Sequence, residues 1–91
     1  GLRGALGIAP TAIVACAVGS LIHRKGLDVV LRALASVRAR GADVHLLVCG
    51  EGETRPALER LAASLGLTQT AHFLGMRPDV GAILRDAADL L

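Results

Sequence analysis

The chain is poor in aromatic side chains: it has no Trp or Tyr, and Phe73 is its only Phe. Recognition of bases or sugar rings by aromatic stacking is therefore nearly excluded. The formal net charge is only +2, and the nine Arg and one Lys are spread along the chain. So small a charge does not indicate a DNA- or RNA-binding surface, and we expect no nucleic-acid partner.

Cysteine is also scarce. Cys16 and Cys49 lie in apolar, strand-like runs, and neither has the spacing of a metal ligand. We interpret both as buried free thiols in a reducing compartment rather than as a disulfide. No apolar run approaches the roughly 18–20 residues that span a bilayer, and no signal peptide is visible. No His, Cys and Asp cluster has metal-ligand spacing, so we expect no metal site.

What the sequence does contain is a regular alternation of two patterns. Continuous apolar runs are typical of central parallel strands, and apolar residues at helical spacing are typical of helices packed on a sheet. The apolar runs cover residues 13–18, 44–49 and 71–74, and each is followed by a glycine: Gly19, Gly50 and Gly75. The helical patterns run from Lys25 to about Arg40, from near Thr54 to Gly66, and from Pro78 onward.

The helical patterns also predict which residues are buried. The first predicted helix has the stripe Leu27, Val30, Leu31, Leu34 and Val37, and Gly41 supplies its C-cap. The second has Leu58, Leu61, Ala62 and Leu65, and the third has Val80, Ile83, Leu84 and Ala87. Residues 89–91 look like the start of a fourth strand.

The order β-α-β-α-β-α-(β) predicts an α/β fold: a Rossmann-like, three-layer arrangement with a parallel sheet between helices. Residues 1–12 form a lead-in with one loose helical turn, and residues 13–91 form the domain. In such sheets ligands bind beyond the carboxyl ends of the strands. We therefore expect Gly19, Gly50 and Gly75 to line one edge.

The segment from Gly19 to Gly26 is the strongest local signal for a site. It leads from a strand into a helix start, where free N–H groups and the helix dipole favour an anion. Arg24 and Lys25 stand at that positive end, which is unfavourable without an anion, and Lys25 is the only Lys. From these residues alone, a phosphate site and a solvated Lys25 are equally good interpretations.

The run VGSLIHRKGLDVVLRAL resembles the start of the donor-binding half of family 4 retaining glycosyltransferases of the GT-B fold, whose pattern is V-G-R-L-x-x-x-K-G. LLVCGEGETRPALERLAASLGL resembles the family's strand, G-x-G loop and helix. HFLGMRPDVGAILRDAADLL resembles its F-x-G strand, next helix and A-D strand start, and GLRGALGIAP resembles its lead-in. The resemblance covers essentially the whole chain, with the four pieces in register.

The resemblance implies an enzyme that transfers a sugar from a nucleoside-diphosphate-sugar donor to an acceptor with retention. It implies that Lys25 contacts the donor diphosphate, together with Gly19, Ser20 and Arg24. Where the family has Arg after V-G, this chain has Ser20, which brings no charge. We hypothesise that Arg24 partly replaces that missing charge.

The same resemblance places two further loops near the nucleotide. Gly50 and Gly52 match the family's G-x-G, although a tight turn is an equally good interpretation of that motif. Gly75, Met76 and Arg77 match the loop that borders the nucleobase. We interpret His45 and His72 as satisfied core or edge residues, whereas His23, in the loop, could touch phosphate.

The family's Glu-x7-Glu element follows the A-D strand, so we expect no catalytic residue within these 91 positions. The chain then represents a fragment of the C-terminal, nucleotide-sugar-binding domain, inactive without the N-terminal acceptor domain. No cofactor is implied beyond the donor itself. The parent enzyme would be cytoplasmic, at the inner face of the membrane where its acceptor is a lipid. A non-catalytic α/β nucleotide-binding or structural module is the alternative.

Overall fold

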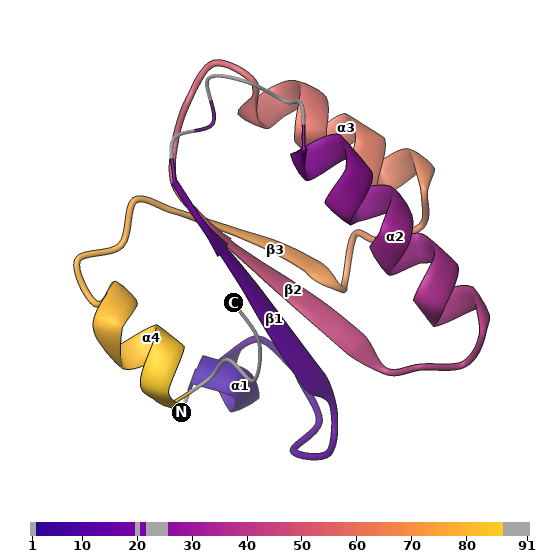
Figure 1. The fold of residues 1–91 in the computed structure, drawn as a ribbon. Helices are drawn as coiled ribbons and strands as arrows, with labels where there is room; N and C mark the ends of the chain where they lie inside the picture. The colour runs from indigo at the N-terminus through magenta and orange to yellow at the C-terminus, as the bar shows by residue number, and fades with distance from the viewer. Residues whose placement is uncertain (1, 20, 22–25, 87–91) are drawn as a thin grey trace.

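Three parallel strands form the centre of the computed structural model, which describes residues 2–19, 21 and 26–86 (Figure 1). The strands alternate with helices along the chain. The elements are α1 (Leu2–Ala5), β1 (Ile13–Val18), α2 (Leu27–Ala39), β2 (Val44–Cys49), α3 (Arg55–Ser64), β3 (Ala71–Gly75) and α4 (Val80–Asp86). The three strands thus lie where the sequence predicted them, and the predicted strand at residues 89–91 lies outside the described residues.

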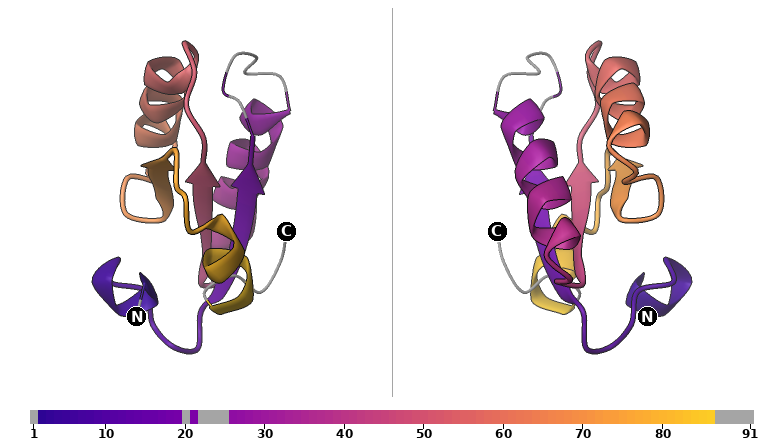
Figure 2. Two further views of the ribbon diagram at one scale, coloured as in Figure 1. Left: turned by 90° about the vertical axis from the view of Figure 1, so that its left-hand side faces the viewer. Right: turned by 90° about the vertical axis from the view of Figure 1, so that its right-hand side faces the viewer.

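The sheet has the order β1-β2-β3, so each strand pairs with its neighbour in sequence. Ile13 pairs with Val44, and the register continues without interruption to Val18 and Cys49. Between β2 and β3 the register shifts after Val48, so that Cys49 pairs with Gly75. Figure 2 shows the three strands pointing to the same end of the molecule, which places all their carboxyl ends at one edge.

Helices cover both faces of the sheet, as the Rossmann-like, three-layer prediction requires. Helices α2 and α3 lie on one face, and α1 and α4 lie on the other (Figure 1). Because strand side chains alternate between faces, Leu46 and Val48 point into the first core, and Leu47 and Cys49 point into the second. The lead-in joins the second core through Ile8 and Ala12, which are both buried.

Helix α2 begins after Gly26, which has φ +91°, and is followed by Gly41, which has φ +93° as the predicted C-cap requires. Its buried residues are Leu31 and Leu34, and Leu27 and Ala35 pack beside them. The prediction that Val30 and Val37 are also buried is wrong: they are 40% and 39% exposed. At 3.6 residues per turn both fall on the flank of the stripe centred on Leu31 and Leu34, and the neighbouring elements do not reach that far round.

Helix α3 confirms its predicted pattern. Thr54 is the N-cap position, and Pro56 lies in the first turn, where a missing N–H costs nothing. Leu58 and Ala62 are buried, and Leu61 and Leu65 pack against the same core. Burying a side chain such as Leu58 completely stabilises the fold by about 1.5–3 kcal/mol. In α4, Val80 and Ile83 pack into the second core, whereas Ala87 lies outside the described residues.

Candidate functional site

The three strand-end glycines meet at the carboxyl edge of the sheet, as predicted. The Gly50 N–H donates to the Gly75 carbonyl (2.8 Å), and the Gly19 N–H donates to the Cys49 carbonyl (3.0 Å). A Cβ on Gly50 would lie 1.7 Å from the Gly19 carbonyl oxygen. No side chain fits at position 50, so backbone alone forms this part of the edge.

Leu21 fastens the loop after β1 to the loop after β2. Its N–H donates to the Glu51 carbonyl (2.9 Å), and its own carbonyl accepts from the Thr54 N–H (2.9 Å) and from the Thr54 hydroxyl. Its side chain is buried in the core beneath α2 and α3. This role of Leu21 was not predicted from the sequence, although two adjacent apolar residues, Leu21 and Ile22, in an otherwise polar loop were a signal that part of the loop is buried.

The predicted anion site is described only in part. Gly19 and Gly26 are the two ends of this segment. Gly26 lies at the N-cap of α2, where its carbonyl accepts a hydrogen bond from the Val30 N–H (3.0 Å). Ser20, His23, Arg24 and Lys25 lie outside the described residues, so their roles stay predictions. The N-terminus of α2, the positive end of its dipole, follows directly after this loop.

A cluster centred on Arg55 occupies the carboxyl edge between β2 and β3. The Arg55 guanidinium pairs with Glu51 through Nη1, with Glu59 through Nε (3.1 Å) and with the Phe73 carbonyl through Nη2 (3.1 Å). The Glu51 carboxylate lies against Gly75, 2.8 Å from where a Cβ would be. Sequence reasoning treated Glu51 only as the middle residue of G-x-G and did not identify Arg55 at all.

The other predicted nucleotide-proximal residues lie beside this cluster. The Gly52 carbonyl accepts from the Arg55 N–H (3.1 Å) at the start of α3. Met76 is 75% exposed after β3. Arg77 makes a two-point ion pair with Asp79, with distances of 2.8 and 2.7 Å, and this contact lowers the pKa of the Asp79 carboxyl.

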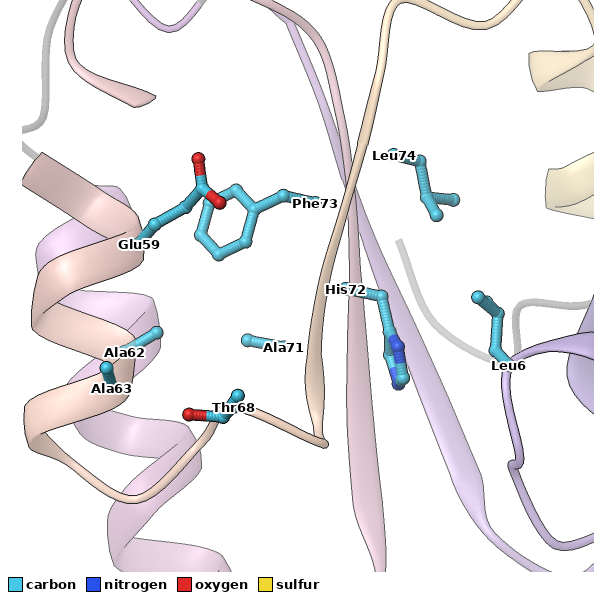
Figure 3. A pocket seen from close by; sticks show the side chains of 9 residues that line it. All are labelled: Leu6, Glu59, Ala62, Ala63, Thr68, Ala71, His72, Phe73 and Leu74. Atoms are coloured by element: carbon cyan, nitrogen blue, oxygen red, sulfur yellow. The ribbon is translucent and has the colours of Figure 1, made fainter. Parts of the chain in front are cut away.

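A second feature lies along the outer side of β3, away from the strand-end glycines. Figure 3 shows His72 and Leu6 on one side of the strand, and Ala71 and Phe73 on the other side facing Glu59 of α3. These residues line a hollow of about 340 Å³. The polar side chains of its lining are those of His72, Glu59 and Thr68, and the others are apolar.

The His45 and His72 side chains are hydrogen-bonded to each other, as expected for satisfied core or edge residues. His45 Nδ1 and His72 Nε2 are 3.0 Å apart, and His45 Nε2 is 3.3 Å from an Asp43 carboxylate oxygen. His45 is buried, whereas His72 is partly exposed. Burial and the neighbouring His45 lower the pKa of His72. Across the described ranges, no group of three His, Cys, Asp or Glu side chains could hold a metal ion.

The two cysteines are buried free thiols, as expected. Burial and the neighbouring Cys49 raise the pKa of the Cys16 thiol to about 11. Such a thiol is protonated and unreactive at neutral pH. Within the part of the chain that the structure describes, no helix is long and apolar enough to cross a bilayer.

The structure belongs to the open parallel α/β class, in which ligands bind beyond the carboxyl ends of the strands. The model of the family "Glycosyl transferases group 1" matches residues 2–91. The chain belongs to this glycosyltransferase family.

Named relatives of the chain are also glycosyltransferases. The chain is 38% identical over 97 aligned positions to D-inositol 3-phosphate glycosyltransferase of Corynebacterium urealyticum, covering 98% of this chain and 23% of that protein. It is 33% identical over 72 positions to GDP-mannose-dependent alpha-(1-6)-phosphatidylinositol monomannoside mannosyltransferase of Mycolicibacterium smegmatis, covering 79% and 19%. The chain thus spans about a fifth of the length of these relatives.

A solved structure shows the same fold. WaaG, a glycosyltransferase involved in lipopolysaccharide biosynthesis, superposes with a TM-score of 0.75 at 38% identity, over 98% of this chain and 24% of WaaG. The predicted Rossmann-like α/β fold is therefore confirmed, and so is the resemblance to glycosyltransferases.

Proposed function

We propose that this chain supplies the diphosphate-binding part of the donor site in a retaining glycosyltransferase. The donor is a nucleoside-diphosphate sugar, and its diphosphate is held by Gly19, Ser20, Arg24 and Lys25. Residues 13–91 belong to the C-terminal domain of a family 4 enzyme, and an N-terminal domain binds the acceptor. Gly50, Gly52, Gly75, Met76 and Arg77 lie on the nucleotide's side of the site.

The observation that carries this proposal is that hydrogen bonds of Leu21 hold the Gly19–Gly26 loop against the loop after β2. Its two-sided backbone pairing with Glu51 and Thr54 holds the start of this loop beside the loop after β2. Next to it, Gly50 has no side chain, which lets the Gly19 backbone pack directly against it and brings the ends of β1 and β2 together. The start of α2 supplies the positive end of a helix dipole to the same place.

The chemistry proposed for this loop is stabilisation of the leaving group. As the bond from sugar to diphosphate breaks, negative charge grows on the diphosphate. In this proposal the positive charges of Lys25 and Arg24 and the α2 N-terminus stabilise that charge and lower the barrier. The Ser20 hydroxyl donates a hydrogen bond to a phosphate oxygen but adds no charge.

The names of two relatives support the donor class and suggest an acceptor class. One relative is named GDP-mannose-dependent and acts on a phosphatidylinositol monomannoside, and another is named for D-inositol 3-phosphate. By this analogy the parent enzyme works in the cytoplasm, with peripheral association at the inner membrane face where its acceptor is a lipid.

Titration calorimetry with GDP and UDP tests the proposal on the chain and on matched variants. Lys25→Ala should weaken binding by about tenfold or more, because a hydrogen bond to a charged group is worth about 1.5–3 kcal/mol. Arg24→Ala should weaken it less. The control is Arg32→Ala, an exposed position on α2. Equal small losses in all three variants, or no binding by the parent chain, would contradict the proposal.

A further inference from the structure

We propose that the Glu51 carboxylate reads the nucleobase of the donor and favours guanine over uracil, and that Arg55 is the positioning residue that holds Glu51 for this task. This inference rests on the proposed donor site and concerns the base of the donor rather than its diphosphate.

Three observations fix the Glu51 carboxylate in place. The Glu51 carbonyl accepts from Leu21, so its backbone is anchored at the carboxyl edge. Its carboxylate is paired with Arg55 and lies against Gly75. The register between β2 and β3 shifts at this point, and such bulges recur beside active sites, where they re-aim side chains.

Arg55 is itself held from two other directions. It donates to the Phe73 carbonyl of β3 and pairs with Glu59 one turn further along α3. Its side chain is 27% exposed, whereas that of Glu51 is 49% exposed. The Arg55 side chain is therefore the less exposed of the two, and the Glu51 carboxylate is accessible to a ligand at the edge.

The charges along this edge assign an orientation to the ligand. The β1 end has the α2 N-terminus, which attracts an anion. The β2–β3 end has two carboxylates, Glu51 and Glu59, around the single Arg55 guanidinium, so this cluster has a net negative charge, and the Glu51 carboxylate accepts hydrogen bonds. A nucleoside diphosphate that crosses the edge thus places its phosphates over β1 and the N–H donors of its base near Glu51.

Guanine suits a carboxylate better than uracil does. Guanine presents two adjacent donors, its N1–H and its 2-amino group, and a carboxylate accepts hydrogen bonds from both. Uracil presents one N–H between two carbonyl oxygens, and these oxygens repel the carboxylate. A good pair of hydrogen bonds to a base edge discriminates by about tenfold or more.

The test is calorimetric titration of the chain with GDP, UDP, IDP and inorganic diphosphate. The parent chain should bind GDP about tenfold more tightly than UDP. IDP, which lacks the 2-amino group, should fall between them. Glu51→Gln should bring the GDP-to-UDP affinity ratio close to one and leave inorganic diphosphate bound at least as tightly, because a repelling charge is gone.

Variants of α3 separate positioning from folding. Arg55→Ala should lower the GDP-to-UDP affinity ratio. Arg55→Lys should have a ratio between those of Arg55→Ala and the parent chain, because a Lys ammonium cannot donate to several partners in one plane as a guanidinium does. The matched control is Glu53→Gln, which removes an exposed carboxylate close to Glu51 in the chain but outside the Arg55 cluster, and it should leave the ratio unchanged. The IDP comparison needs no variant, so it stands even if Glu51→Gln fails to fold.

The outcomes distinguish this inference from the proposed function. A GDP-to-UDP ratio near one in the parent chain, or a ratio that Glu51→Gln leaves unchanged while Lys25→Ala still weakens both nucleotides, overturns the role of Glu51 alone. Absence of binding by every nucleotide overturns the donor site itself.

Discussion

Replacing Gly50 by alanine probes the contact on which the strand-end edge depends. The new Cβ would lie 1.7 Å from the Gly19 carbonyl oxygen and 2.9 Å from its carbon. Both obstacles are backbone, and each glycine is held by a strand-end hydrogen bond: Gly19 to Cys49 and Gly50 to Gly75. A side-chain rotation cannot relieve this clash, so the ends of β1 and β2 must move apart.

The expected cost follows from these contacts. Overpacking typically costs about 1–3 kcal/mol, and each weakened backbone hydrogen bond adds about 1 kcal/mol. We therefore expect Gly50→Ala to lower the free energy of unfolding by about 3–5 kcal/mol, which is a large share of the roughly 5–15 kcal/mol typical of a domain.

Urea unfolding followed by far-UV circular dichroism measures this loss, since the chain has no Trp or Tyr for fluorescence. The control is Gly66→Ala, where φ is +75° but an added Cβ meets nothing within 4 Å. In that variant the free energy of unfolding should fall only by the cost of backbone strain, about 1–2 kcal/mol. Equal shifts of the urea midpoint in both variants would refute the close approach of the two strand ends.

Two further predictions concern titration. The pKa of His72 lies below its usual 6.5, owing first to burial and then to His45, so the unfolded chain takes up this proton at higher pH than the folded one. The contribution of His72 to the free energy of unfolding is therefore fully present above about pH 6.5 and declines as the pH falls further. His72→Gln should make the free energy of unfolding less dependent on pH in urea titrations at pH 7.5 and 5.5. Cys16, with its pKa of about 11, should react with a disulfide reagent at pH 8 only as fast as the chain unfolds.

These two predictions have their own controls. A His72→Gln variant whose stability falls between pH 7.5 and 5.5 as steeply as that of the parent would rule out His72 as the source. Thiol labelling as fast in buffer as in concentrated urea would show that Cys16 is not protected by the fold.

The order of elements was predictable because each strand and helix has a strong pattern of its own. Continuous apolar runs closed by glycine located β1, β2 and β3, and parallel pairing then implied that Gly19, Gly50 and Gly75 share an edge. The exposed Val30 was not predictable in the same way. Its exposure depends on how far neighbouring elements reach round α2, which the helical period does not encode.

The site was less predictable than the fold because its parts come from different segments. The ion pairs of Arg55 with Glu51 and Glu59 were not predicted, although each joins residues four apart in the sequence. The reach of Arg55 to the Phe73 carbonyl, and the pairing of Leu21 with Glu51, are long-range contacts with no local signature. Sequence patterns locate such loops, and only the packing of the sheet shows which of them touch.

The hydrogen bond from Arg55 to the Phe73 carbonyl also bears on how the molecule avoids associating with itself. β3 is an outer strand of the described sheet, and outer strands offer backbone groups to strands of other molecules. Here Arg55 already occupies the Phe73 carbonyl, and the Ala71 N–H donates to Leu67 (2.9 Å). An incoming strand would have to displace a guanidinium held by two carboxylates, so the same arginine protects this side of the sheet against edge-to-edge aggregation.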